Sequence, residues 1–292
     1  MHYVKAKGIL SSKNGMNIYR GCLHGCIYCD ARSACYQMNH DFEDIEVKEN
    51  AVELLEAALK SRRKKCMIGT GAMTDPYMPI EKTLCNTRKC LELIDRYGFG
   101  AAVHTKSALV LRDIDILKSI NNKSKAVVQM TLTTADDNLC KIIEPNVSVT
   151  SERYEALCSL RDEGIPTVVW LDPVLPFIND TKDNIARILD MCIKAQVKGI
   201  ICFSMGVTLR TGNREYSYKK LDKFFPGIKQ KYIDSYGSSY ILDSPNNNML
   251  MKYFYQVCKQ NNIMSNPDEI FRYMGTFEDK YEQAQMSIFD YL

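Results

Sequence analysis

The stretch that decides the fold is Tyr19-Arg-Gly-Cys-Leu-His-Gly-Cys-Ile-Tyr-Cys29, which spaces three cysteines as C-x3-C-x2-C. Thiolates are the usual ligands of iron–sulfur clusters, and three cysteines this close together can reach three corners of one cube. The fourth iron is then left without a protein ligand. The spacing therefore predicts a [4Fe–4S] cluster on Cys22, Cys26 and Cys29.

The same three cysteines allow two other interpretations. With His24, Cys35 or His40 they would form a structural zinc site, and without a metal they would be buried thiols. Zinc sites usually combine one pair of neighbouring ligands with a distant pair, and this triplet has no such partner pair. The cluster is the favoured interpretation, because the triplet also follows a candidate strand and opens an alternating array of strands and helices.

That array extends from the triplet to residue 205. Short apolar runs, rich in Val, Ile and Ala as buried parallel strands should be, occupy 66–71, 100–105, 126–132, 167–171 and 199–205, with a weaker run at 17–20. Helical periodicity lies between them, at 51–60, 84–97, 109–120, 152–163 and 183–195. Six such units predict an α/β core domain, a partial (β/α)6 TIM-like barrel, over residues 1–205.

After residue 205 the pattern changes. Residues 206–292 carry many tyrosines and lysines, little strand signal and a helical pattern at 249–260. This region is interpreted as a C-terminal helical extension packed on the barrel.

Composition limits the class of protein. The 292 residues are 46% hydrophobic, which argues against disorder, and a net charge of +3 indicates no global affinity for polyanions. Twelve scattered cysteines in a chain this long do not resemble a secreted disulfide scaffold. The start, Met1-His-Tyr-Val-Lys5, has no apolar signal core, and no apolar run is long enough to span a membrane. A reducing, cytoplasmic location without membrane contact is expected.

The triplet, with Tyr28 directly before its third cysteine, resembles the radical S-adenosylmethionine (SAM) superfamily. The resemblance implies that the amino and carboxylate groups of SAM bind the open iron. It implies that the reduced cluster cleaves SAM and that the 5′-deoxyadenosyl radical takes a hydrogen atom from substrate. It also implies an electron donor such as flavodoxin or ferredoxin, and it places Tyr28 near the adenine.

Further motifs are similar to the spore photoproduct lyase-like (DNA repair photolyase-like) branch of that superfamily. They are D-P-Y-x-P-x-E at 75–81, T-K-S at 105–107, Leu111-Arg-Asp113, Glu144-Pro145 and the loop 172–176. This narrower resemblance covers the chain from the cysteine triplet to about residue 180.

By this resemblance, residues that follow the second and third strands bind SAM. Lys106 supplies a cation for the carboxylate, and Thr74 and Asp75 bond the amino group and atoms on the cluster side. The alternative is ordinary capping by Thr74 and Asp75, with Lys106 in solvent.

Two later residues complete the expected SAM site. Thr131, late in the fourth strand, offers its hydroxyl to the carboxylate or the ribose, and Arg153 pairs with the carboxylate or with Glu144.

The sequence departs from the lyase pattern at two positions. Ala72 stands where the lyases place a hydrogen-donor cysteine, and Asp30 stands where they place a tyrosine. Alanine cannot donate a hydrogen atom and aspartate cannot carry a tyrosyl radical, so repair by the lyases' relay is not expected. Cys35 and Cys140 are the candidate substitute donors.

Signals for macromolecular partners are local. The basic run at 60–65 lies at a predicted helix C-terminus, where complementing the helix dipole is the favoured explanation over a nucleic-acid contact. The segments 216–220 and 229–232 mix aromatic residues with lysines and suit either single-stranded nucleic acid or an ordinary surface helix. Gln285-Met-Ser-Ile-Phe289 resembles the peptide that binds the bacterial sliding clamp; alternatively this tail docks on its own barrel.

Three functions follow as hypotheses. The leading one is hydrogen abstraction from an unidentified substrate, with DNA or a nucleotide lesion as the first candidate. The second is radical chemistry on a peptide or small metabolite. The third is a non-catalytic zinc or iron–sulfur module recruited to DNA.

Overall fold

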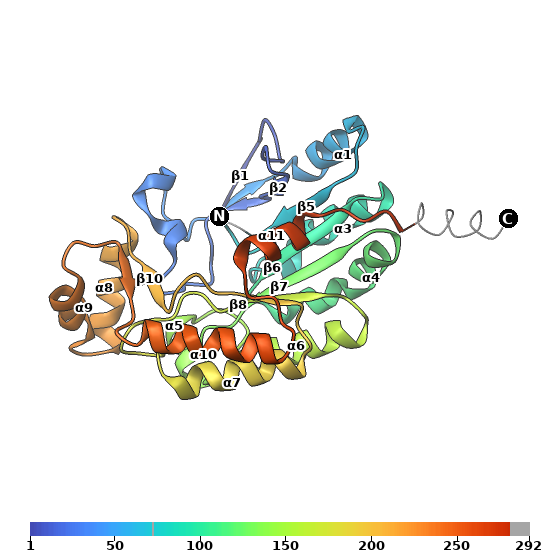
Figure 1. Cartoon of the computed structure of the whole chain (residues 1–292). Coiled ribbons are helices and arrows are strands. Elements are labelled where there is room, and N and C mark those ends of the chain that lie inside the picture. Colours follow the sequence, from blue (N-terminus) through green and yellow to red (C-terminus); the bar gives the residue numbers. More distant parts are fainter. Residues whose placement is uncertain (72, 281–292) are drawn as a thin grey trace.

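Six short strands form one open, parallel sheet in the computed structural model, which describes residues 1–71 and 73–280 (Figure 1). In spatial order they are β2 (Gly15–Met16), β5 (Met67–Thr70), β6 (Gly100–Thr105), β7 (Ala126–Thr131), β8 (Thr167–Trp170) and β9 (Gly199–Ile201). Every neighbouring pair is parallel. Among the described residues β2 and β9 do not pair with each other, so the predicted partial (β/α)6 barrel is confirmed.

Helices connect the strands, because a parallel pair needs a crossover. The larger ones are α1 (Ala51–Ser61), α3 (Asn86–Arg96), α4 (Ile114–Lys123), α6 (Thr150–Asp162) and α7 (Lys182–Lys194). Short elements between them are α2 (Glu81–Leu84), α5 (Asp137–Ile143) and the 3-10 turns η1 (Asp30–Arg32), η2 (Ala34–Tyr36) and η3 (Ala108–Asp113). The five predicted helical segments are confirmed, with ends shifted by a few residues.

The sheet is buried because its strands are apolar along their whole length. All six residues of β7 are buried, and helix residues such as Leu55, Leu117 and Ile188 cover the strands without measurable exposure. Removing apolar surface from water is the dominant favourable term in folding. The strand ends, where polar residues follow, are therefore the part of the sheet that is free to form a site.

The weakest predicted strand, 17–20, is corrected by the structure. The first sheet strand is Gly15–Met16, and Tyr19–Arg20 forms β3 in a separate sheet of order β1-β4-β3. There β3 pairs antiparallel with β4 (Glu46–Lys48), which pairs parallel with β1 (His2–Val4). Backbone pairing with β4 takes the chain out of the main sheet just before Cys22.

The region after residue 205 consists of two parts (Figure 1). In the first, β10 (Gly206–Thr208) pairs antiparallel with β11 (Ile241–Asp243). Between these two strands the chain forms α8 (Asn213–Phe224) and α9 (Ile228–Tyr236). In the second, α10 (Asn247–Gln260) lies beside α7, and α11 (Pro267–Gly275) packs on β9. The helix expected at 249–260 is α10, whose Leu250 and Phe254 belong to the main core. The domain boundary at residue 205 stays a prediction.

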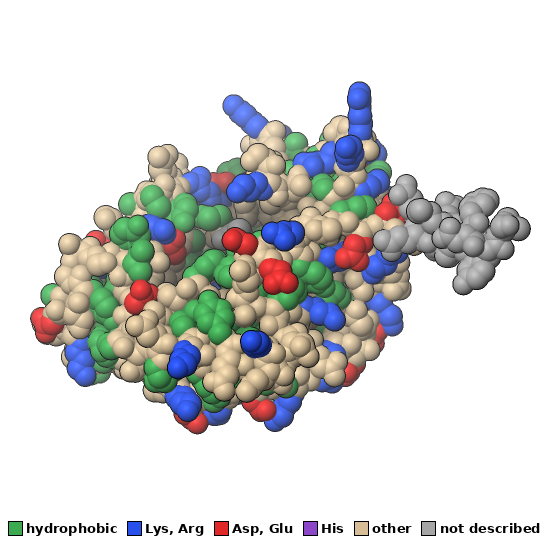
Figure 2. All heavy atoms as spheres, in the orientation of Figure 1, with side chains coloured by type: hydrophobic (Ala, Val, Ile, Leu, Met, Phe, Trp, Pro, Cys, Tyr) green, Lys and Arg blue, Asp and Glu red, His purple; other side chains and the backbone are tan. Residues whose placement is uncertain are grey.

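Two surface properties bear on partners. None of the helices within residues 1–71 and 73–280 has the length and apolar character needed to cross a membrane. On the face drawn in Figure 2, basic and acidic side chains are interspersed, in keeping with the low net charge.

Candidate functional site

The three predicted cluster cysteines line one cavity of about 520 Å³, together with residues at or just after the carboxyl ends of β5, β6, β7 and β8. Cys22 is only 9% exposed and Cys26 only 7%. The cavity therefore lies at the carboxyl ends of parallel strands, where this class of fold places its ligands. No disulfide involves these cysteines, so their sulfurs remain available as ligands.

The loop that carries the cysteines is held tightly. Gly21 has φ +86°, and a Cβ there would lie 2.5 Å from the carbonyl oxygen of Phe42, so only glycine fits. The amide of Cys22 donates to that same carbonyl at 3.1 Å, and the Thr74 hydroxyl donates to the carbonyl of Gly21 at 2.5 Å. Thr74 lines the cavity as predicted, but in this arrangement its hydroxyl binds the cysteine loop.

The chemistry of the three thiols fits an iron–sulfur centre. Burial raises the pKa of Cys22 to about 12 and also raises the pKa values of Cys26 and Cys29. Three uncompensated thiolates would therefore be unfavourable in this cavity, whereas a cationic iron centre deprotonates the thiols that bind it. The donor set suits a [4Fe–4S] cluster held by three cysteines.

Asp75 joins the cysteine loop to two strand ends. Its Oδ1 accepts from the Thr105 hydroxyl at 2.7 Å and from the amide of Tyr77 at 2.8 Å. Its Oδ2 accepts from the amide of Lys106 at 2.7 Å and lies 3.0 Å from Nε2 of His24. Burial opposes ionisation, but the charge of His24 and these donors hold the pKa of Asp75 well below its usual range.

These four contacts occupy the acceptor positions of the Asp75 carboxylate. The structure thus gives Asp75 a positioning role, and its direct contact with the SAM amino group stays a prediction.

Lys106 brings a cation into the cavity; the other lysine or arginine that lines it, Arg210, is paired with Asp30. The side chain of Lys106 lines the cavity, and among the described residues its ammonium makes no hydrogen bond or ion pair. Burial lowers its pKa, but the negative groups of Cys26, Glu144 and Asp75 outweigh burial and raise it. The raised pKa keeps this half-buried ammonium charged, and since it has no direct partner among the described residues it is free to bind an anionic ligand, for which a carboxylate is the natural candidate.

Tyr28, which lines the cavity, is hydrogen-bonded to a buried ion pair of Glu144 and Arg153 that lies outside the cavity lining. The Tyr28 hydroxyl and the Arg153 guanidinium both donate to Glu144, and Arg153 also donates to the carbonyl of Thr131 at 2.6 Å. Arg153 is fully buried and does not line the cavity, so of its two expected partners the structure selects Glu144. Tyr28 and Thr131 do line the cavity, and their predicted contacts with the cofactor stay predictions.

The two candidate substitute donors lie outside the cavity. Cys140 is buried with its sulfur 2.9 Å from Nη2 of Arg153, and Cys35 is exposed. Neither lines the cavity, so the structure does not support either as a donor to a radical formed there. Ala72 lies outside the described residues. Asp30 is committed to Arg210 of the extension and to the Tyr36 hydroxyl, 3.0 Å away.

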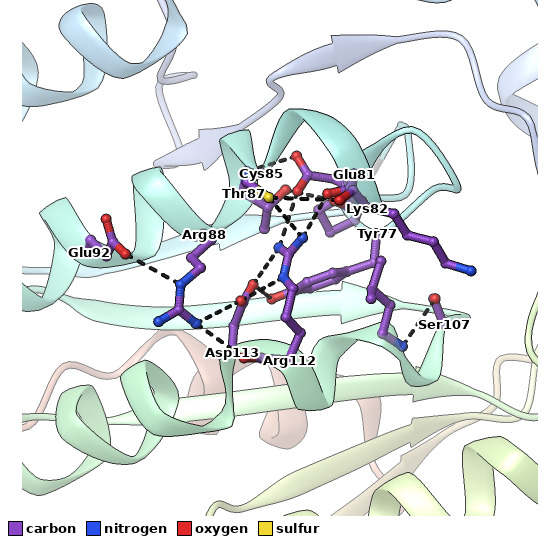
Figure 3. Close-up of polar contacts among 12 residues, drawn as sticks. Tyr77, Glu81, Lys82, Cys85, Thr87, Arg88, Glu92, Ser107, Arg112 and Asp113 are labelled. Carbon is purple, nitrogen blue, oxygen red and sulfur yellow. Dashed lines mark hydrogen bonds and ion pairs between the residues drawn. The ribbon is translucent and has the colours of Figure 1, made fainter.

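The remaining motif residues support the loop of Asp75 (Figure 3). The guanidinium of Arg112 lies between Glu81, at 3.2 Å, and Asp113, at 2.8 Å. The Tyr77 hydroxyl donates to Asp113 at 2.9 Å, and the hydroxyl of Tyr19 donates to Glu81. Both carboxylates are fully buried and satisfied. These motif residues therefore fix the loops around the cavity without entering it.

Two ring residues of the cavity wall were not selected as site residues from the sequence. His104 lies 3.0 Å, through Nε2, from the Thr131 hydroxyl, and its ring stacks on Trp170 with centroids 4.9 Å apart. Burial, together with the charge of Lys106, lowers the pKa of His104 to about 3, so the ring is neutral near pH 7. His104 and Trp170 lie near the ends of predicted strands, and this position is the sequence signal that could have predicted them as site residues.

Asp172, two residues after the end of β8, also lines the cavity and is not among the site residues predicted from the sequence. Burial raises its pKa to about 6, against the opposing charge of Lys106. Its carboxyl makes no hydrogen bond within residues 1–71 and 73–280. An acid with this pKa beside a cavity can give or take a proton near neutral pH.

Similarity to known proteins covers most of this region. The family described as the radical SAM superfamily matches residues 16–192. An uncharacterized protein of Methanocaldococcus jannaschii is 34% identical over 176 residues, which are 60% of this chain and 65% of that protein. A protein of Pseudomonas phage M6, named radical SAM Nalpha-GlyT isomerase, is 25% identical over 58% of this chain and 34% of its own length. The chain thus spans less than two thirds of these curated relatives.

Solved structures agree on the fold. A cysteine-to-alanine variant of spore photoproduct lyase with dinucleoside spore photoproduct gives a TM-score of 0.64 at 13% identity, covering 90% of this chain and 79% of that chain. A variant of the same lyase with bound SAM gives 0.61 at 12% identity, covering 86% and 74%. With the family match across the cysteine loop and the sheet, these findings establish that the chain belongs to the radical SAM superfamily.

Proposed function

We propose that this chain binds a [4Fe–4S] cluster on Cys22, Cys26 and Cys29, cleaves SAM reductively, and abstracts a hydrogen atom from an organic substrate. The observation that carries the proposal is that three thiols and one half-buried ammonium, that of Lys106, meet in a single cavity, and that this ammonium has no direct partner among the described residues. When bound, the cluster and SAM supply a 5′-deoxyadenosyl radical, and the protein positions the reactants around it.

The residues of the cavity divide this work. The three cysteines bind the cluster, and the ammonium of Lys106 donates a charge-assisted hydrogen bond to the carboxylate of SAM. Asp75 fixes the backbone of Lys106 and the ring of His24, so the cation and the cysteine loop keep a constant separation. A volume of about 520 Å³ lies within the usual range for cofactor pockets.

The substrate is proposed to carry a planar ring, with a nucleobase of DNA or a nucleotide as the first candidate. Trp170 and Phe203 line the cavity, and Phe203 is 56% exposed. Phe271 of α11 lies 5.9 Å from Trp170 and 6.4 Å from Phe203, measured between ring centroids. Exposed rings at a cavity mouth favour stacking with a base, which contributes about 1–3 kcal/mol per base.

A substrate of another class would use the same rings. An aromatic side chain of a peptide, or a ring-bearing metabolite, also stacks on tryptophan and phenylalanine. The relatives do not decide between these classes: one is named for a GlyT isomerase, and the lyase structure contains a dinucleoside. The low net charge of +3 likewise leaves DNA as a candidate and not a requirement.

Two partners belong to this proposal. Reduction of the cluster needs an electron donor such as flavodoxin or ferredoxin. Recruitment to DNA by the sliding clamp would use residues 285–289, which lie outside the described residues.

The test begins with anaerobic reconstitution and iron analysis of the wild type, Cys26→Ser and the control Cys35→Ser. About four irons per chain are expected in the wild type and the control, and fewer in Cys26→Ser, which lacks one ligand. The reduced protein should then convert SAM to 5′-deoxyadenosine. Protein that holds zinc in place of iron, or that binds a cluster and forms no 5′-deoxyadenosine, would support the non-catalytic alternative instead.

The substrate class is tested separately. The reduced enzyme is incubated with SAM and deuterated nucleotides, oligonucleotides or peptides. Deuterium in 5′-deoxyadenosine identifies the substrate that gives up its hydrogen. Transfer from peptides alone would contradict the nucleic-acid candidate while leaving the radical chemistry intact.

A further inference from the structure

A second group of potential metal ligands lies on the small sheet, outside the cavity. His2 of β1, Glu46 of β4 and His40, from the loop before β4, bring one ligand atom each to within 4.8 Å of one another. The pairing of β1 with β4 sets His2 directly beside Glu46. None of the three lines the large cavity.

The two imidazoles are oriented in the manner of metal ligands. Nδ1 of His2 lies 2.9 Å from Oδ2 of Asp44, and Nδ1 of His40 lies 3.1 Å from the carbonyl oxygen of Asp41. Each acceptor keeps the proton on Nδ1, which leaves the lone pair on Nε2. Metal-binding histidines are usually fixed through their other nitrogen in this way, by a carboxylate or a backbone carbonyl.

The atoms that face one another lack the proton donor they need. Nε2 of His40 is a buried atom with no hydrogen-bond partner in the described part of the chain, and Oε2 of Glu46 lies 3.7 Å away from it. With Nδ1 protonated, both of these atoms are acceptors, and a buried Nε2 that faces a carboxylate oxygen instead of a donor is unfavourable. The rings of His2 and His40 meet edge to face, with centroids 4.9 Å apart. A cation between the three atoms would satisfy all of them.

We propose that His2 Nε2, His40 Nε2 and a carboxylate oxygen of Glu46 bind one divalent zinc ion, with water as the fourth ligand. Two imidazoles and a carboxylate are an established donor set for zinc. Tetrahedral zinc with bonds of about 2.0–2.1 Å places its ligand atoms roughly 3.3 Å apart. The His40–Glu46 distance is already near that value, and a separation of up to 4.8 Å closes by a small side-chain rotation.

The ion would act as a structural clamp on the segment behind the cysteine loop. It would fasten His40 to β1 and β4, and β4 pairs with β3, which leads into Cys22. Phe42, two residues after His40, provides the carbonyl that accepts from the amide of Cys22. This zinc site is separate from the cysteine triplet, because Nε2 of His40 is directed to Glu46 and not to a sulfur.

The test measures zinc on the reconstituted holoprotein by metal analysis and by competition with a chelator. One zinc per chain is expected in addition to the cluster iron. His40→Ala and Glu46→Gln should each weaken zinc binding by about 100-fold or more, because each removes a ligand. Asp44→Asn should weaken it by roughly 10–100-fold through the orientation of His2. Glu49→Gln, an exposed carboxylate on the same segment, is the matched control and should bind as the wild type does.

Two further measurements test whether each variant folds and whether the zinc is independent of the cysteine triplet. Iron content and far-ultraviolet circular dichroism show that each variant is folded, and the near-isosteric Glu46→Gln and Asp44→Asn serve if His40→Ala does not fold. The triple variant with Cys22, Cys26 and Cys29 changed to alanine should keep its zinc. Loss of zinc in that variant, no zinc in the wild type, or equal affinity in Glu46→Gln and Glu49→Gln would overturn the proposal.

Discussion

Replacing Lys106 by methionine separates binding of the cofactor from stability of the fold. Its half-buried side chain lines the same cavity as the cysteines, and its ammonium makes no hydrogen bond or ion pair within residues 1–71 and 73–280. Methionine keeps the length and apolar stem of the side chain and removes only the charge. The free energy of unfolding of the cluster-free protein should therefore change by no more than about 1 kcal/mol.

Binding of SAM should respond much more strongly. A hydrogen bond between an ammonium and a carboxylate contributes about 1.5–3 kcal/mol. Since 1.4 kcal/mol is tenfold in affinity, Lys106→Met should weaken binding by roughly 10- to 150-fold. The dissociation constant is measured by anaerobic equilibrium dialysis on the reconstituted protein, after matching iron content between samples.

The control is Lys252→Met, which removes an exposed lysine of α10 that does not line the cavity. It should bind SAM as the wild type does. If Lys106→Met also binds within about threefold of the wild type, the carboxylate is held elsewhere and the reasoning from the unpaired ammonium is wrong.

Four other outcomes are expected. Asp75→Asn should lower the free energy of unfolding, measured in urea, by about 3 kcal/mol, because it breaks a buried charge pair. Since the pKa of Asp75 is depressed in the folded protein, the stabilisation from its carboxylate is present above about pH 4 and is lost as the pH falls below that value. The pH dependence from Asp172 has the opposite sign, because its pKa is raised to about 6 in the folded protein. Its contribution to the free energy of unfolding is fully present below about pH 4 and is lost as the pH rises through 6. Asp172→Asn should remove this change of about 3 kcal/mol when the free energy of unfolding is measured against pH. Phe203→Ala should weaken binding of the ring-bearing substrate by about 5- to 150-fold and leave SAM affinity unchanged, as dialysis of each ligand will show; equal substrate affinity would contradict the stacking role. Changing Gln285 and Phe289 together to alanine should abolish capture by immobilised sliding clamp, and persistent capture would end that hypothesis.

The predicted site and the observed site differ in how residues share the work. The resemblance assigns Thr74 and Asp75 to the cofactor, yet their polar atoms bind other parts of the protein in this structure, and of the two partners expected for Arg153 the structure shows Glu144. A motif indicates which residue types occur at which positions. It does not distinguish a residue that contacts the cofactor from one that fixes the loop of such a residue. Lys106 differs because its ammonium has no such partner among residues 1–71 and 73–280.

The sequence by itself determined the features that depend on neighbours in the chain. Cys22, Cys26 and Cys29 lie within one loop, and the alternation of apolar runs with helical periodicity is a local pattern. Both features could therefore be predicted from the sequence alone. Strand order followed, because parallel strands with helical crossovers usually pair in chain order.

Only the tertiary structure decided which distant residues meet. Asp30 and Arg210 are 180 positions apart, and Tyr28 and Glu144 are 116 apart, yet each pair is hydrogen-bonded. The ring group at the cavity mouth and the His2–His40–Glu46 group likewise combine separate elements. Such contacts depend on strand register and helix packing, which are set by burial of the whole core and leave no local pattern in the sequence.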